Sequence, residues 1–153
     1  MINLEILDGF DYLEEAAALF AEYKNFLGLD LSFQPADETT DEISKRYSGG
    51  RIFIARVDSK FAGVIAYHPM EDPKNCELKR FFVRDEFRGF KVGRVLIEHA
   101  IDSAKSDGYQ SIFLDTHEDL KSARHLYESL GFKKISPYYF NPLEHVIYYR
   151  LDF

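Results

Sequence analysis

The sequence has a single cysteine, no long apolar run and no excess of basic residues. Cys76 alone can form neither an internal disulfide nor a zinc site built from several cysteines. The sequence contains no run of about 18 apolar residues, the length that crosses a membrane. Residues 1–15 lack the basic region and the apolar core of a secretion signal. We therefore expect a cytoplasmic protein that makes no use of a membrane.

The charge balance also limits the classes of partner. Lysine and arginine number 19 against 26 aspartates and glutamates, which gives a net charge of −7. A protein that binds nucleic acid generally needs a basic surface, so we do not expect such a partner. An acidic chain favours a cationic or amine ligand, although the same charge also serves solubility alone. Both interpretations stay open at this point.

What the sequence does contain is the pattern of one globular domain over residues 1–153, with 46 % hydrophobic and 16 % aromatic residues. Alternating and helical apolar spacing predicts the element order β-α-α-β-β-β-α-β-α-β-β. This order indicates an α/β protein of the α+β type, with helices on the faces of a mixed sheet. We place the second helix over a binding cleft. The predicted strands are 2–7, 51–57, 60–67, 78–83, 111–115, 133–136 and 145–151, and the predicted helices are 10–27, 37–47, 91–105 and 119–130.

The segment from Cys76 to Arg94 reverses the acidic trend of the chain. A strand leads into a loop and then into a helix, and Arg88, Lys91 and Arg94 fall within seven residues. Backbone N–H groups at the start of a helix bind anions readily. The loop is neither a Walker motif nor a GxGxxG fingerprint. On its own, it is either a phosphate site or a solvated helix cap.

A second motif, Ala-x-x-Leu-Tyr-x-x-Leu-Gly-Phe, runs from Ala123 to Phe132. Its spacing predicts an amphipathic helix that ends at Gly131. Tyr127 lies on the apolar face of this helix, where its hydroxyl group needs a partner. The tyrosine is therefore either a buried structural residue or a catalytic one.

Together, these two motifs resemble those of the GNAT superfamily of acyl-CoA-dependent N-acetyltransferases, and the resemblance covers essentially the whole chain. The family signature Arg/Gln-x-x-Gly-x-Gly/Ala is matched at Arg88 and Gly93, whereas Lys91 replaces the first glycine. Leu120 stands where many members have an asparagine. The resemblance implies the GNAT fold and acetyl-CoA as the co-substrate.

The resemblance also implies roles for individual residues. Phe81, Phe82 and Val83 would pair with the pantetheine arm, and a backbone N–H near Val83 would hold the thioester oxygen. Tyr127 would protonate or stabilise the coenzyme A thiolate. The pyrophosphate would lie on the loop and the helix start, formed by Arg88, Gly89, Phe90, Lys91, Val92, Gly93 and Arg94.

Transfer to an amine requires a group that takes the proton of the ammonium form, whose pKa is about 10. Glu77 is our candidate for this base, or for a residue that orients water, because it begins the central strand. It is alternatively a strand-end charge paired with Lys79 or Arg80. Cys76 is either a covalent nucleophile or a small buried residue. The histidines show no metal-ligand spacing, and His117 either lines the acceptor cleft or is solvated.

The segment 137–142 places two tyrosines and an asparagine between prolines. It forms either an aromatic turn or a wall of the acceptor pocket.

We predict an N-acetyltransferase that moves the acetyl group of acetyl-CoA to a primary amine of a small molecule, by direct attack in a ternary complex. A protein N-acetyltransferase and a non-catalytic acyl-CoA-binding sensor are the alternatives. The identity of the acceptor stays open, and so does a homodimer.

Overall fold

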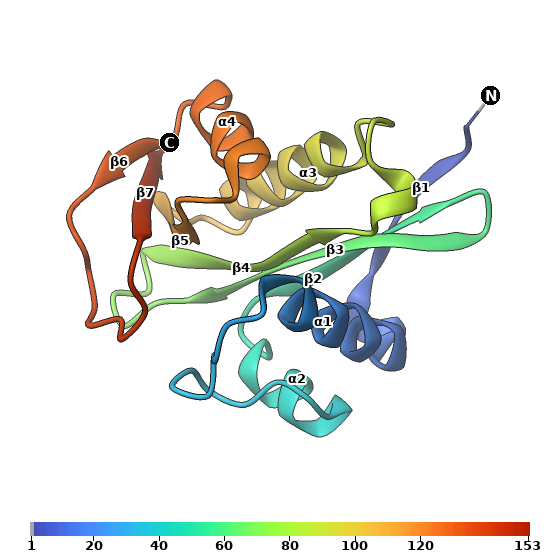
Figure 1. Ribbon diagram of the computed structural model, residues 1–153, viewed down its shortest axis with the longest axis horizontal. Helices are drawn as coiled ribbons and strands as arrows, with labels where there is room; N and C mark the ends of the chain where they lie inside the picture. Colours follow the sequence, from blue (N-terminus) through green and yellow to red (C-terminus); the bar gives the residue numbers. More distant parts are fainter. Residues whose placement is uncertain (1) are drawn as a thin grey trace.

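The computed structural model describes residues 2–153, which form seven strands and four α-helices (Figure 1). The predicted element order is confirmed, and two short 3-10 turns, η1 (Gly9–Asp11) and η2 (Asp85–Phe87), are added to it. The strands are β1 (Leu4–Asp8), β2 (Arg51–Val57), β3 (Lys60–Pro69), β4 (Asn75–Val83), β5 (Ser111–His117), β6 (Lys133–Ile135) and β7 (Val146–Asp152). The helices are α1 (Leu13–Leu27), α2 (Thr40–Arg46), α3 (Val92–Ser106) and α4 (Lys121–Ser129).

The strands form one mixed sheet in the order β1-β2-β3-β4-β5-β7-β6, with helices on both faces. Helices α1 and α2 cover one face, and α3 and α4 cover the other (Figure 1). Successive side chains of a strand point to opposite faces. Accordingly, Ile52 and Ile54 pack in the cluster beneath α1, whereas Phe53 and Ala55 belong to the cluster beneath α3. The sheet is therefore buried on both sides, as the layer architecture requires.

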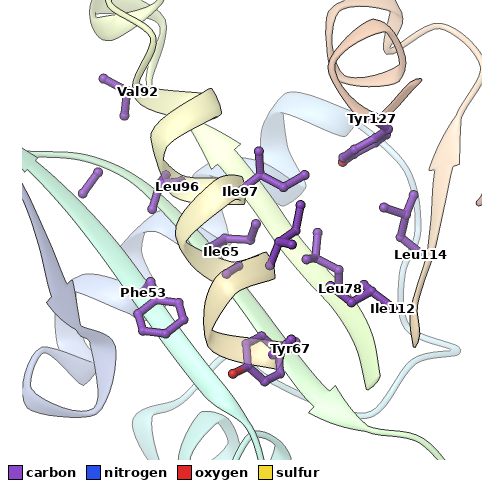
Figure 2. Close-up of a cluster of buried hydrophobic side chains, with 14 of the residues drawn as sticks. Phe53, Ile65, Tyr67, Leu78, Val92, Leu96, Ile97, Ile112, Leu114 and Tyr127 are labelled. Atoms are coloured by element: carbon purple, nitrogen blue, oxygen red, sulfur yellow. The ribbon is translucent and has the colours of Figure 1, made fainter. Parts of the chain in front are cut away.

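The cluster on the α3 face is the larger one and fixes α3 against the centre of the sheet (Figure 2). Leu96 and Ile97 are fully buried there, over Ile65 and Leu78 from the neighbouring strands. Burial of each such side chain contributes roughly 1.5–3 kcal/mol. Tyr127 lies at the edge of this cluster, on the side of α4 that faces the sheet (Figure 2). The same packing that holds α3 thus holds the tyrosine in place.

The parallel strands β4 and β5 pair over only a short length. Their register joins Asn75 to Ser111 and ends with Glu77 opposite Phe113. Beyond Glu77 no pairing between the two strands is recorded, although β4 continues to Val83. The sheet is therefore open between the two carboxyl ends, which is the usual place for a ligand in a parallel arrangement.

A bulge in β4 lies beside this opening. The register with β3 shifts between Val64 and Ala66, and Arg80 has a φ of 59°, in the left-handed region. A bulge bends its strand and turns one side chain in a new direction. The predicted strand 78–83 includes the bulge but begins three residues after the observed start of β4 at Asn75. Residues 75–77 belong to the strand through backbone pairing with β5, which an apolar pattern does not reveal.

Candidate active site

One pocket, here called the outer pocket, lies where the end of β4 meets the first turns of α3 and α4. Its volume of about 510 Å³ falls within the range of small-molecule sites. Tyr23 and Phe26 of α1 close it on one side. Eight of the ten residues predicted to hold the cofactor line it, namely Phe81, Phe82, Val83, Arg88, Gly89, Lys91, Val92 and Gly93.

The backbone at the start of α3 is free to accept an anion. The first helical hydrogen bond is donated by Val95 to the carbonyl of Lys91, which leaves the preceding N–H groups without a helical acceptor. Lys91 provides no side-chain cap and has a φ of 62°. A Cβ on Gly93 would lie 3.3 Å from Cζ of Phe81, so glycine permits the close approach of α3 to β4. Residues that fit a phosphate-bearing cofactor are therefore in place.

The two remaining predicted cofactor residues, Phe90 and Arg94, do not line the outer pocket. Phe90 is half exposed on the loop. Arg94 donates to Glu98 at 3.1 Å and to Ser129 at 3.1 Å, on the outer surface of α3 and α4. These two contacts hold the Arg94 side chain away from the outer pocket.

A second, smaller pocket of about 70 Å³ continues from the first between β4 and β5, and we call it the inner pocket. The two share four lining residues, Tyr23, Phe81, Leu120 and Ala123, and therefore adjoin. Its other walls come from α1 and the loop after it, from β4, β5 and α4, and from the loop before β7, and are lined by Leu27, Leu29, Leu31, Gln34, Leu78, Lys79, Arg80, Leu114, Asp115, Thr116, His117, Tyr127, Asn141, Leu143 and Val146.

Tyr127, the predicted thiolate partner, lines the inner pocket. Burial raises the pKa of its phenol well above the ordinary value, with smaller contributions from Tyr23 and Asp115. The phenol therefore keeps its proton at neutral pH. No hydrogen bond from this hydroxyl to another residue is recorded within 2–153, so the proton is available to a ligand.

Glu77, the predicted base, lines neither pocket. Its carboxylate accepts a hydrogen bond from Tyr138 at 2.6 Å and lies 3.1 Å from Nε2 of His68 and 3.6 Å from Nζ of Lys79. Burial opposes its ionisation, but His68, Lys79 and Tyr138 outweigh burial and lower the pKa to about 2. The contact with Lys79 agrees with the alternative of a paired strand charge, whereas Arg80 pairs elsewhere.

Asp115 is a pocket residue that the sequence did not reveal. It lies near the end of β5, lines the inner pocket and accepts a hydrogen bond from Tyr139. Nζ of Lys79 lies 3.6 Å from its Oδ1. The only sequence signal was one acidic residue among apolar strand residues, as in Ile-Phe-Leu-Asp.

Some of the other residues that were predicted to line the acceptor cleft lie at the inner pocket. His117 lines it, and so does Asn141 from the segment 137–142. The two tyrosines of this segment instead donate hydrogen bonds to Glu77 and Asp115.

The prediction that the helix at 37–47 lies over the cleft is wrong. The preceding loop lines the pocket instead, because α1 ends at Gly28 in a left-handed conformation with a φ of 65°.

The sequence matches the family described as acetyltransferase (GNAT) over residues 13–132. The chain belongs to the GNAT family. An uncharacterized N-acetyltransferase of Schizosaccharomyces pombe is 39 % identical over 143 residues, which cover 92 % of this chain and 88 % of the relative. The N-acetylaspartate synthetase of Danio rerio is 31 % identical over 88 residues, or 58 % of this chain and 31 % of its own length. This GNAT chain is therefore an N-acetyltransferase.

A crystal structure supports the same assignment for the fold. A GNAT acetyltransferase from Staphylococcus aureus Mu50 matches with a TM-score of 0.77 at 25 % identity, over 99 % of both chains. Within residues 2–153, no group of three or more histidine, cysteine or acidic side chains is arranged to hold a metal ion. None of the helices in this range is long and apolar enough to cross a membrane.

Proposed function

We propose that this N-acetyltransferase moves the acetyl group of acetyl-CoA to the primary amine of a small molecule, by direct attack within a ternary complex. The observation that carries the proposal is the junction of the two pockets at the opening between β4 and β5. A cofactor in the outer pocket and an amine in the inner pocket would meet beside Phe81, where the pockets adjoin.

Acetyl-CoA would supply an activated acetyl thioester, and the outer pocket fits its phosphates and its arm. The free N–H groups at the start of α3 would bind the pyrophosphate, assisted by the cations of Arg88 and Lys91. The end of β4, which has no partner strand on the β5 side, would hydrogen-bond the amide groups of the pantetheine. Phe90 and Arg94 have no part in this arrangement, since both lie outside the pocket.

Direct attack is favoured over a covalent acyl-enzyme by the position of Cys76. This thiol is fully buried beneath α3, and burial raises its pKa to about 12. A thiol nucleophile reacts as the thiolate, which such a site disfavours strongly. The nitrogen of the amine therefore forms the new bond to the acetyl carbon as the carbon–sulfur bond breaks.

Tyr127 would stabilise the sulfur that leaves. Its phenol stays protonated and lines the inner pocket next to the shared wall. Because its pKa lies above that of an ordinary thiol, a hydrogen bond to the thiolate is more favourable than complete transfer of the proton. After the attack the nitrogen would lose its second proton to solvent, and the released thiolate would take a proton from solvent.

The ammonium proton of the acceptor would leave toward Asp115. Among the carboxylates near the opening, Asp115 lines the inner pocket and Glu77 does not. The low pKa of Glu77, about 2, also makes it a weaker base than an ordinary glutamate. Glu77 would instead be a positioning residue, which holds His68 and Tyr138 beside the pocket.

The inner pocket, about 70 Å³, has room for the reacting end of an acceptor. The name of the Danio rerio relative, N-acetylaspartate synthetase, describes an acetylated small molecule. A protein acceptor and a non-catalytic acyl-CoA sensor remain the rivals. A sensor would have no use for a protonated phenol beside the pocket junction.

The test is release of free thiol from acetyl-CoA with a panel of small amines, for the wild type and for Tyr127→Phe. We expect the variant to lower kcat about 100-fold, with little change in coenzyme A affinity. Tyr149→Phe is the matched control, because Tyr149 packs 5.9 Å from Tyr127 but lines neither pocket. Equal turnover in both variants would remove Tyr127 from the mechanism, and no thiol release by the wild type would favour the sensor.

A further inference from the structure

A buried group of cations stands behind the inner pocket. Asp37 is 1 % exposed and accepts contacts from Lys24 at 2.7 Å, from Arg46 at 2.8 Å and from Arg80 at 2.8 Å. Tyr47 adds a hydrogen bond to the same carboxylate at 3.2 Å. Three cations thus share one carboxylate, which leaves the group with two positive charges in excess.

The acidic residues next to this group do not balance the excess. Lys79 lies between Glu77 and Asp115, 3.6 Å from each. Counted together with the Asp37 group, four cations face three carboxylates in these contacts. Lys24 keeps 22 % of its side chain exposed, whereas Arg46, Lys79 and Arg80 are buried. An anion bound beside the buried cations would be favourable.

Arg80 brings this charge to the pocket. Its Nε and Nη2 donate to Asp37 at 2.8 and 3.3 Å, and it lines the inner pocket. No partner of its Nη1 is recorded within residues 2–153, and Nη1 is not among the fully enclosed unpaired atoms. The left-handed backbone of Arg80 in the bulge of β4 is unfavourable for arginine, and such conformations concentrate at functional sites.

The same pocket also offers an unpaired hydrogen-bond acceptor. Oε1 of Gln34 is enclosed and has no partner within residues 2–153, although Gln34 lines the inner pocket. A buried polar atom without a partner calls for an explanation, and a ligand is one. The pocket therefore has a free guanidinium N–H, a free carbonyl oxygen and the carboxylate of Asp115.

We propose that the acceptor carries a carboxylate beside its amine, as an amino acid does, and that Arg80 binds this carboxylate. The amino group would then lie toward Gln34 and Asp115, and Leu29 and Leu31 would contact the rest of the molecule. This inference rests on the proposed function, because it concerns the acceptor of the same transfer. An arginine with one guanidinium edge held by Asp37 presents its remaining N–H groups in a fixed direction.

The experiment compares each amino acid with the amine that lacks its carboxylate, for example leucine with 3-methylbutylamine, by thiol release from acetyl-CoA. We expect the wild type to prefer the amino acid about 10- to 100-fold in kcat/KM, the usual value of a hydrogen bond to a charged group. In Arg80→Gln the ratio of the two kcat/KM values should fall to about 1.

Arg46→Gln is the matched control. It removes the same charge from the same carboxylate, because Arg46 contacts Oδ2 of Asp37 at 2.8 Å, but Arg46 does not line the inner pocket. The preference for the carboxylate should therefore persist in Arg46→Gln. The comparison of substrates in the wild type needs no variant, so it decides whether the acceptor carries a carboxylate even if Arg80→Gln fails to fold.

The outcomes separate this inference from the proposed function. Acetylation of amines with no preference for a carboxylate, or of peptide amines only, would overturn the inference, and so would a preference that survives in Arg80→Gln. If small amines are acetylated without a preference for a carboxylate, the thiol release would still support the transfer reaction. No release with any amine, with or without a carboxylate, would contradict both.

Discussion

The outer and inner pockets adjoin but are built in different ways. Most of the outer pocket comes from one continuous segment, 81–93, and the groups that we propose to bind the anion are backbone N–H groups. The inner pocket takes side chains from six separate segments, namely α1, the following loop, β4, β5, α4 and the residues from Asn141 to Val146. The outer pocket thus depends on local geometry, whereas the inner pocket depends on contacts between residues far apart in the sequence.

This difference suits the two proposed roles. A cofactor site can be shared by all members of a fold family, whereas an acceptor site must differ from one member to another. A site made of backbone N–H groups depends little on the side chains around it. A site of converging side chains is altered by single substitutions. We therefore expect the inner pocket, and not the outer one, to determine the acceptor. The following substitutions test each region separately.

The largest effect is expected from Asp37→Asn, behind the inner pocket. Removal of the carboxylate leaves Lys24, Arg46 and Arg80 without their shared partner. Loss of one partner from a buried ion pair costs about 3–5 kcal/mol, so the free energy of unfolding should fall by that amount. Urea unfolding at pH 7 measures it, and a loss below about 1 kcal/mol, the value of an exposed pair, would contradict the proposed role of Asp37.

The pH dependence gives an independent check of the same group. Burial opposes ionisation of Asp37, but Arg80, Lys24 and Arg46 outweigh it and lower the pKa. A depressed folded-state pKa means that the stabilisation is complete above the unfolded value, about 3.9, and is lost as the pH falls further. The free energy of unfolding of Asp37→Asn should therefore fall less on acidification than that of the wild type. Asp107→Asn removes a carboxylate from the more exposed pair with Arg51, so its pH dependence should stay closer to that of the wild type.

A smaller effect is expected from Arg88→Glu in the outer pocket. A negative charge beside the N–H groups of α3 should weaken coenzyme A binding about 10- to 100-fold, as measured by calorimetry at low salt. Arg94→Glu makes the same change in charge outside the pocket, where Arg94 contacts Glu98 and Ser129. Its loss of affinity should be clearly smaller, and equal losses would mean that charge alone, and not position, governs binding.

Much of the fold followed from the sequence because it rests on local patterns. Apolar periodicity predicted every strand and α-helix in order, and the family resemblance of the motif from Arg88 to Gly93 indicated residues that line the outer pocket. Phe90 and Arg94 were included in that motif because sequence proximity does not show which way a side chain points. Element ends were less certain, since they depend on backbone pairing such as that between Glu77 and Phe113.

The inner pocket could not be predicted in the same way. Arg80 and Asp37 are 43 residues apart, and Glu77 and Tyr138 are 61 apart, with no periodicity that links either pair. The bulge that turns Arg80 is likewise invisible to an alternating pattern, which shows a continuous strand from 78 to 83. Single charged residues in apolar strands, such as Lys79 and Asp115, are the signal that the sequence offers.

The smallest effect is expected from Lys91→Gly, which separates backbone strain from charge in the outer pocket. The left-handed φ of 62° costs a residue with a Cβ about 1–2 kcal/mol, and glycine loses about 0.5–1 kcal/mol through its greater freedom in the unfolded chain. The free energy of unfolding should rise by the difference, about 0.5–1 kcal/mol. Coenzyme A affinity should fall less than tenfold, because Arg88 remains. Lys91→Met keeps the strain and removes the charge, so it should lose the same affinity without the gain in stability. A gain in affinity in Lys91→Gly alone would instead show that the Cβ of Lys91 keeps phosphate at a distance.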